Sequence, residues 1–342
     1  MSIHPSLVTQ PLKRIRNIRV LQVLLTTLIF QVPGACAEWL HESAAIMGTR
    51  VSVELWHDRA DEGAQAIQEV FDEFRRLDDK LSPYKEHSEL SLVNRMAAEA
   101  PVPISGEFFQ LLEISRDYSR LTDGAFDITF ASVGHLYNYR TGEKPTEEAT
   151  RAKLALIDYH QVKLDPEQNS VFFDRPGVTI DLGGIAKGYA VDRAIELLRS
   201  RGVQHALVTA GGDSRLLGDH QGRPWQIGIQ APRRKNAIAT TLNLQDSAVS
   251  TSGDYERYFE ADGVRYHHII SPKTGHSASE MQSVTVIGPN ATRTDALSTS
   301  LFVLGVEAGM ALIDRLDDVE AVMIDSHGEL FLSRGLASQN PD

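Results

Sequence analysis

Residues 178–188 read VTIDLGGIAKG and carry the clearest structural signal in this chain. A short strand is expected over 178–181, and the paired glycines at 183 and 184 then end it. A helix is expected to follow to about Arg201, because its apolar residues recur at spacings of three and four. Glycines let the backbone approach a ligand closely, and free N–H groups at a helix N-terminus attract anions. The segment predicts either an anion-binding loop or a tight strand–helix turn with Lys187 in solvent.

Outward from this segment, short strands and amphipathic helices follow one another irregularly. Alternating apolar residues predict a half-buried strand over 49–55, and apolar stripes predict helices over 61–81 and 107–121. Further elements are expected as an exposed loop at 140–150, short strands at 162–164, 171–173 and 206–208, several strands up to 287, two helices over about 293–316 and a closing strand at 321–324. Because short turns join many strands, an α+β fold with mixed or antiparallel sheets packed against helices is favoured over a doubly wound parallel sheet.

The N-terminus has the features of an export signal. Four Lys/Arg residues between positions 13 and 19 precede a mostly apolar run, and Ala35-Cys36-Ala37 is a small-x-small cleavage pattern. We interpret 1–37 as a signal peptide and 38–342 as one periplasmic domain. A retained anchor helix, with inner-membrane association, is an alternative. Lipidation of Cys36 is another, although Pro33 stands where a lipoprotein signal has leucine.

Composition limits the possible partners. The 342-residue chain has a net charge of −12, and because residues 1–37 contribute four positive charges and no negative ones, the remainder carries −16. This acidic balance, with no basic tract, argues against a nucleic-acid partner. A nucleotide ligand would need backbone amides or a divalent cation to offset the charge. Cys36 is the only cysteine, so no intramolecular disulfide is possible.

Asp295 and Thr299 stand four residues apart at the start of an expected helix, and therefore on one helical face. Two hard oxygen ligands so placed suit Mg²⁺, which keeps other positions for water and substrate phosphate. An acidic residue in a first turn also favours the helix dipole, so the pair alone does not establish a metal site.

Several other polar or aromatic residues have both a functional and a structural interpretation. His267 and His268 are adjacent on an expected strand, so only one of them can face a given pocket. Tyr84 follows the first long helix and fits either a stacking aromatic or a capping core residue. Asn94, Asp127, Asp213 and Asp254 stand beside turn residues, where local hydrogen bonding is the default.

Taken together, these segments resemble the ApbE family of FAD:protein FMN transferases. The matching segments run in family order from about Met47 to Leu332 and are 47–49, 84–94, 124–127, 181–189, 211–213, 250–255, 268–275 and 295–299. Each motif is weak alone, but eight in order are specific.

The resemblance implies a T-fold-like α+β architecture that binds FAD and a divalent cation, usually Mg²⁺. The implied activity transfers FMN from FAD to a threonine or serine hydroxyl of another protein and releases AMP. Typical acceptors are flavin-carrying subunits of exported or membrane redox complexes. The alternatives are a Mg²⁺-dependent FAD pyrophosphatase, which produces free FMN and AMP, and a non-catalytic periplasmic flavin-binding protein.

The resemblance also implies residue roles. Asp295 and Thr299 match the side-chain metal ligands, with the backbone carbonyl of Ala186 as a third, and His268 matches the residue that deprotonates or orients the acceptor hydroxyl. Tyr84 matches the aromatic that covers the isoalloxazine ring, and Asn94 stands at a position linked to transfer rather than hydrolysis. The remaining positions that match FAD contacts are Met47, Ala125, Phe126, Asp127, Gly183, Lys187, Tyr189 and Ile270.

One position departs from the family pattern. Ser271 replaces the aspartate that normally precedes the proline of the histidine motif. A serine can still cap the turn, but the missing negative charge is expected to lower the basicity of His268.

Overall fold

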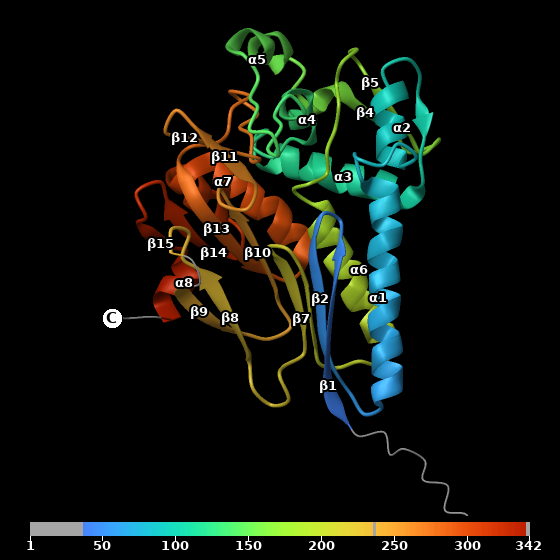
Figure 1. Ribbon diagram of the computed structural model, residues 1–342, viewed down its shortest axis with the longest axis vertical. Helices are drawn as coiled ribbons and strands as arrows, with labels where there is room; N and C mark the ends of the chain where they lie inside the picture. The colour runs from blue at the N-terminus through green and yellow to red at the C-terminus, as the bar shows by residue number, and fades with distance from the viewer. Residues whose placement is uncertain (1–36, 235–236, 340–342) are drawn as a thin grey trace, which may run out of the picture. The chain divides into compact units, whose positions relative to one another are not determined.

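A large antiparallel sheet is the main structural layer of the protein (Figure 1). The computed structural model describes residues 37–234 and 237–339. The strands of this sheet, in spatial order, are β1 (Glu38–Ile46), β2 (Thr49–His57), β6 (Ala206–Ala210), β7 (Asp213–Leu217), β10 (Ala248–Gly253), β13 (Met281–Gly288), β14 (Glu320–Asp325) and β15 (Leu330–Leu332). Every neighbouring pair is antiparallel. The α+β fold class is confirmed.

Three helices cover one face of the large sheet. They are α1 (Ala60–Leu81), α6 (Ala186–Ser200) and α7 (Ala291–Ile313). The predicted strand at 49–55 presents Val51, Val53 and Leu55 to these helices, and all three side chains are fully buried. The apolar stripe of α1 packs into the same core, as its helical periodicity predicted.

The opposite face of the sheet is covered in part by a hairpin. β8 (Trp225–Gln230) pairs with β9 (Ile238–Leu244), and Trp225 packs against Leu216 and Val249 of the sheet. The short helix α8 (Arg334–Gln339) contacts β14. Because β13 lies between two covered faces, all eight of its residues are buried rather than alternately exposed.

A second group of elements lies at the upper end of the view in Figure 1. It consists of α2 (Glu89–Met96), β3 (Val102–Pro103), α3 (Gly106–Leu121), η1 (Ile128–Phe130), α4 (Ala131–Gly134), α5 (Glu147–Leu154), η2 (Tyr159–Gln161), β4 (Val162–Asp165), β5 (Ser170–Phe173), β11 (Tyr258–Ala261) and β12 (Val264–His267). β3, β5 and β4 form one small antiparallel sheet, and β11 and β12 form a hairpin. α3 contacts α7, which connects this group to the helices on the large sheet.

The long segment α7 contains a kink, so the prediction of two helices in this region is correct. Gly305 has a φ of 77°, a left-handed conformation that glycine adopts without steric cost. Among the described residues, α7 is also the helix that is long and apolar enough to cross a membrane by length and composition. Its apolar residues instead pack against β10, β13 and β14, as expected of a core helix.

Three sequence predictions were wrong in detail. The loop expected at 140–150 ends earlier, because α5 begins at Glu147 with Thr146 as its N-cap. Residues 178–181 are extended but belong to no strand, because the side chain of Asn94 takes the hydrogen bonds of Ile180 that a neighbouring strand would have made. The strand at 321–324 is not the closing one, since β15 and α8 follow it; β1 was not predicted at all. The predicted signal peptide, apart from Ala37, and Cys36 lie outside the described residues.

Candidate functional site

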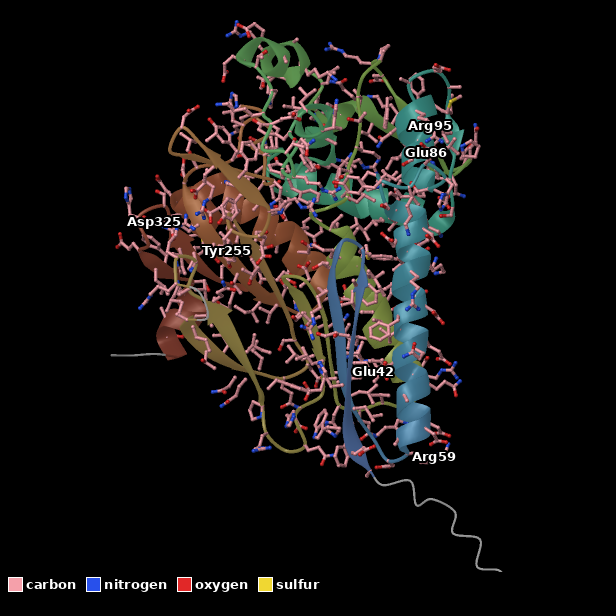
Figure 2. The ribbon with its side chains drawn as sticks, in the orientation of Figure 1. Glu42, Arg59, Glu86, Arg95, Tyr255 and Asp325 are labelled. Atoms are coloured by element: carbon pink, nitrogen blue, oxygen red, sulfur yellow. The ribbon has the colours of Figure 1, made fainter. Side chains whose placement is uncertain are left out.

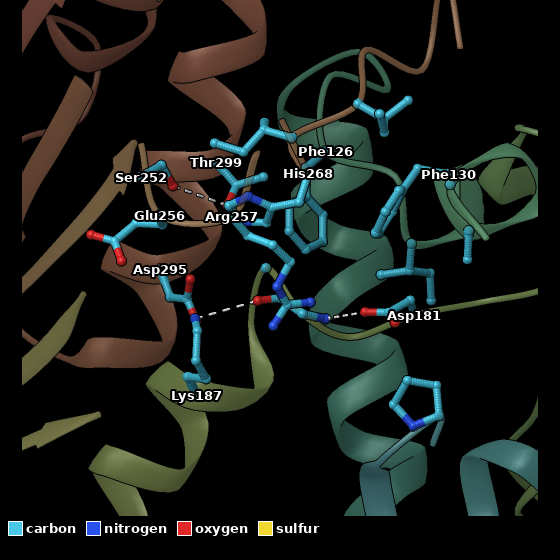
Figure 3. Close-up of a pocket in the computed structure, with 18 of the residues that line it drawn as sticks. Phe126, Phe130, Asp181, Lys187, Ser252, Glu256, Arg257, His268, Asp295 and Thr299 are labelled. Carbon is cyan, nitrogen blue, oxygen red and sulfur yellow. Dashed lines mark hydrogen bonds and ion pairs between the residues drawn. The ribbon is translucent and has the colours of Figure 1, made fainter. Parts of the chain in front are cut away.

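A cavity of about 690 Å³ opens where the large sheet meets the second group of elements (Figure 3). Its size is in the range of small-molecule sites, roughly 300–1,000 Å³. Most of the predicted site residues line it, namely Met47, Tyr84, Asn94, Ala125, Phe126, Asp127, Gly183, Lys187, His268, Ile270, Asp295 and Thr299. Residues that are more than 200 positions apart in sequence therefore share one cavity.

Two predicted site residues lie outside the wall of this cavity. Tyr189 is two positions after Lys187 on α6, and residues two apart point about 200° away from each other on a helix. Its hydroxyl accordingly donates to Glu107 of α3, at 3.2 Å. Ala186 is buried at the first position of α6. Their proposed contacts with FAD and metal stay predictions.

A close contact between α6 and α7 places Asp295. A Cβ at Gly188 would lie 2.2 Å from the carbonyl oxygen of Ala291, so only glycine allows the two backbones this near. The Gly188 N–H donates to Asp295 Oδ2 at 3.0 Å. One turn further along α6, the carboxylate of Asp192 accepts from the N–H groups of Ala291 and Thr292, both at 2.8 Å. Asp192 therefore fixes the start of α7, and with it the direction of the Asp295 side chain.

Asp295 is part of a buried charge cluster with Lys187 and Asp213. Lys187 Nζ lies 2.6 Å from Asp213 Oδ2 and 3.4 Å from Asp295 Oδ2. Burial, and then the charge of Asp213, raises the pKa of Asp295 above the ordinary range of a carboxyl. Burial disfavours the charged form of Lys187, but the two carboxylates overcome it and raise the pKa of that amine. Lys187 is therefore a cation held by protein carboxylates.

Thr299 lies one helical turn after Asp295 and beside β10. Its hydroxyl is 3.3 Å from the hydroxyl of Ser252, as the dashed line in Figure 3 shows. A Cβ at Gly184 would stand 3.1 Å from Thr299 Oγ1, so the glycine loop passes directly over this hydroxyl. The loop glycines thus leave the oxygen of Thr299 accessible next to Asp295.

These oxygens fit a hard cation that is completed by a ligand. Both side-chain hydrogen bonds that Asp295 accepts within the described residues go to Oδ2, so Oδ1 has no such partner there. Within residues 37–234 and 237–339, no three His, Cys, Asp or Glu side chains form a cluster that would hold a metal unaided. Mg²⁺ commonly binds through one or two carboxylates plus substrate phosphates, so the donor set of Asp295 and Thr299 is consistent with that ion.

The two adjacent histidines point to different sides, as the strand geometry predicted. His267 is buried, and its Nε2 lies 2.7 Å from the carbonyl oxygen of Ala278. His268 lines the cavity, and its Nδ1 has no hydrogen-bond partner among the described residues. Burial, followed by the charge of Arg257, lowers the pKa of His268 to about 3. The imidazole of His268 is thus neutral at pH 7.

In the turn that contains Ser271, where the family pattern has aspartate, the hydrogen bonds are made by the backbone. The carbonyl of Ser271 accepts hydrogen bonds from the N–H groups of Thr274 and Gly275, at 3.2 and 2.8 Å. The turn is thus capped through the backbone. The low pKa of His268 arises from burial and from neighbouring cations.

Asn94 holds the backbone that leads into the glycine loop. Its amide oxygen accepts from the Ile180 N–H at 2.8 Å, and its amide nitrogen donates to the Ile180 carbonyl at 2.9 Å. Next to it, the Asp181 N–H donates to the carbonyl of Ile128, and Asp181 Oδ1 accepts from Gly183 N–H at 2.6 Å. The Asn94 side chain, which comes from α2, therefore bonds the Ile180 backbone as a neighbouring strand would. It fixes this part of the cavity wall.

The loop that carries Tyr84 is held just after that residue, whereas the ring of Tyr84 is exposed. Lys85 pairs with Asp79 at 2.7 Å. Arg95 donates to the carbonyl of Glu86 at 2.9 Å, and Figure 2 shows these two residues together beside α2. Tyr84 is 81% exposed at the mouth of the cavity. An aromatic side chain held by its backbone but left exposed is suited to stacking on a ligand.

The opposite wall is aromatic and rigid. Phe126 is buried, and Tyr137 and Tyr139 stack with ring centroids 5.9 Å apart. Asp127 is committed to structure, because its oxygens accept from the N–H and hydroxyl of Thr129 and from the N–H of Tyr159. Asp127 therefore makes the local hydrogen bonds that its position beside turn residues predicted.

Sequence reasoning did not single out three charged residues of the cavity, Asp181, Glu256 and Arg257. Asp181 belongs to a matched segment but was not assigned a role. Glu256 and Arg257 follow the segment 250–255 directly, and no spacing or motif distinguished them from other exposed charges. Arg257 reaches the cavity because the hairpin of β11 and β12 leads the chain back from Arg257 to His268. The His268 N–H donates to the carbonyl of Arg257 at 3.1 Å.

Comparisons with known proteins find related sequences along most of this chain. The profile of the ApbE family matches residues 47–323. A Klebsiella pneumoniae protein named FAD:protein FMN transferase is 35% identical over 85% of this chain and 90% of its own length. A Vibrio cholerae protein of the same name is 32% identical over 89% and 93%.

Solved structures give the same picture at the level of the fold. The crystal structure of the ApbE protein from Thermotoga maritima superposes with a TM-score of 0.83, at 32% identity over 89% of this chain and 100% of that one. The flavin transferase ApbE from Vibrio cholerae superposes with a TM-score of 0.79, at 29% identity over 88% and 99%.

Proposed function

Because the chain belongs to the ApbE family, we propose that it is an FAD:protein FMN transferase, the activity named for its relatives. In this reaction a hydroxyl oxygen of an acceptor protein attacks the phosphorus on the FMN side of FAD. The bond between that phosphorus and the bridging oxygen breaks, and AMP leaves. The acceptor then carries FMN through a phosphoester bond.

One observation supports this proposal above the others. Asp295 and Thr299 of α7 and His268, which follows β12, line a single cavity whose other wall is aromatic. The arrangement offers a polar end for a diphosphate and an apolar end for a flavin ring. Tyr84 and Phe126 would contact that ring.

His268 would receive the proton of the attacking hydroxyl. Its neutral imidazole has an unpartnered Nδ1 among the described residues, so a hydroxyl can donate to the ring without displacing a protein partner. A pKa of about 3 makes His268 a weak base in the free protein. The negative phosphates of bound FAD would raise that pKa, because an opposite charge nearby favours the imidazolium.

The charges at the phosphates would be handled by residues of α6 and α7. Asp295 and Thr299 would hold Mg²⁺, and the amides of the glycine loop at 183–188 would donate to the same phosphates. Bound Mg²⁺ supplies charge neutralisation at the cleaved diphosphate. A carbonyl ligand from Ala186 stays a proposal that the family resemblance supports.

The setting of the reaction is also part of the proposal. The acceptor would be a flavoprotein subunit of a periplasmic or membrane redox complex, reached after export through the signal in residues 1–37. Anchoring through Cys36 is the alternative, and the basic and apolar N-terminal sequence supports export in either case.

A single assay tests the proposed activity. The purified protein is incubated with FAD, Mg²⁺ and a candidate acceptor, and the acceptor is then denatured and separated. Transfer predicts AMP release together with flavin fluorescence on the denatured acceptor band. Free FMN with AMP would instead identify a pyrophosphatase, and tight FAD binding without AMP would identify a flavin-binding protein.

A further inference from the structure

The cavity has a charge balance that opposes its proposed ligand. Four of its lining residues are carboxylic acids, Asp127, Asp181, Glu256 and Asp295, and two are lysine or arginine, Lys187 and Arg257. A diphosphate carries negative charge, so it requires cations that the protein has not already neutralised. How the phosphates bind therefore depends on which cationic side chains of the cavity are not already paired with protein carboxylates.

Lys187 is not such a cation. Its ammonium is engaged by Asp213 at 2.6 Å and by Asp295 at 3.4 Å, and it also donates to the carbonyl of Gly183. Both carboxylates lie on its side of the cavity and are almost fully buried. A ligand phosphate would have to compete with them.

Arg257 is uncommitted. Within residues 37–234 and 237–339, its guanidinium forms no ion pair and no side-chain hydrogen bond, although it lines the cavity. Figure 3 shows Arg257 beside His268 and reaching toward Asp181. Its charge acts on both neighbours, since it lowers the pKa of His268 and opposes the rise in the pKa of Asp181. By contrast, the nearby Arg233 and Arg265 are paired with Asp254, at 2.6 and 3.3 Å.

We propose that Arg257 binds a phosphate of the FAD substrate beside His268 and is the main protein cation of this site. A guanidinium presents two parallel N–H groups to phosphate oxygens, which orients the group as well as neutralising it. Held next to His268, it would stabilise the charge that develops as the bond to AMP breaks. The inference rests on the proposed function and adds the residue that recognises the diphosphate.

The test compares ligands that differ in phosphate content. Binding of FAD, ADP and riboflavin is measured calorimetrically, at fixed Mg²⁺, for the unmodified protein and for Arg257→Ala. We expect the variant to lose about tenfold or more in affinity for FAD and ADP, as for a lost charge-assisted hydrogen bond. Riboflavin has no phosphate, so its affinity should change less than about twofold.

Two further variants make the outcome specific. Arg257→Lys keeps the charge without the planar fork and should fall between the other two proteins. Arg151→Ala removes an exposed arginine of α5 and should leave all three affinities unchanged. Unchanged FAD and ADP affinity in Arg257→Ala, or an equal loss for riboflavin, would overturn the inference. A raised KM for the acceptor with unchanged FAD affinity would assign Arg257 to the acceptor instead.

The failure of this inference is distinguishable from the failure of the proposed function. If the unmodified protein binds FAD and transfers FMN but Arg257→Ala does so equally well, the activity stands and the role of Arg257 is wrong. If the unmodified protein binds no FAD, the proposed function itself is wrong, and the inference falls with it.

Discussion

At the scale of the residue, Asp295 combines burial with a charge that its neighbours only partly offset. Its side chain is almost fully enclosed, and Asp213 stands close enough to raise its pKa. Such a carboxylate costs stability in the free protein, and a divalent cation would relieve that cost. Carboxylates whose pKa is raised by burial and by a neighbouring negative charge are common at functional sites.

Asp295→Asn should remove transfer while the fold is retained. The amide keeps an oxygen that can accept from the Gly188 N–H, so that backbone donor is not left unpaired. We expect FMN transfer, followed as AMP release, to fall by about a hundredfold or more, since a ligand of the charge-neutralising ion is weakened. Transfer at the normal rate, with an unchanged melting temperature, would exclude Asp295 as a metal ligand.

His268 gives a prediction about pH. With a pKa near 3 in the free protein, its imidazole is neutral throughout the range in which an ordinary histidine, with a pKa of about 6.5, would gain a proton. The ratio of kcat/KM for FAD, which reports the free protein, between the unmodified protein and His268→Gln should therefore stay constant between about pH 5.5 and 8. A ratio that declines below a midpoint near 6.5 would show that His268 titrates normally.

At the scale of the element, the contact between α6 and α7 determines the site. Asp192, Gly188 and Asp295 link the two helices through backbone donors, and Ala291 and Ala296 of α7 join the buried residues of α6 in one core. A displacement of α7 would move Asp295 and Thr299 together, because both lie on its first turns.

Gly188→Ala should test this contact. Its Cβ would fall 2.2 Å from the backbone oxygen of Ala291, which cannot rotate away. We expect a loss of about 1–3 kcal/mol in the free energy of unfolding, measured in urea, and a larger loss of transfer. Gly106→Ala is the matched control, because Gly106 also lies in the first turn of a helix but a Cβ there meets nothing within 4 Å. Equal stability of the two variants would refute close packing at Gly188.

At the scale of the whole molecule, the cavity joins two groups of elements. Met47, Lys187 and Asp295 belong to the large sheet and its helices, whereas Tyr84 and Phe126 belong to the second group. A ligand that contacts both should stabilise them together.

FAD should therefore raise the melting temperature of the protein in a single transition. At a free concentration of 100 times Kd, a ligand that binds only the native state adds about 2.7 kcal/mol to the free energy of unfolding. The shift should be larger with Mg²⁺ than with EDTA, as measured by calorimetry. Identical shifts in both buffers would argue against a metal between FAD and Asp295.

Sequence periodicity alone was sufficient for much of the fold. The stripes of α1 and α3 and the alternation in β2 were visible because burial acts directly on residue pattern. The segment at 178–181 misled this reasoning, since a strand and an extended segment tied to a side chain have the same local composition. Asn94 makes that difference from 86 positions away.

The sequence by itself determined the residue types of the site, their order and the family to which they point. Residue types, their order and the family resemblance can be read from the sequence, because they do not depend on where each residue lies in the fold. The tertiary structure alone decided that Tyr189 faces Glu107, that Lys187 is neutralised by two carboxylates and that Arg257, beside His268, has no side-chain partner among the described residues. Charge balance depends on distances between residues far apart in the chain, and only folding sets those distances.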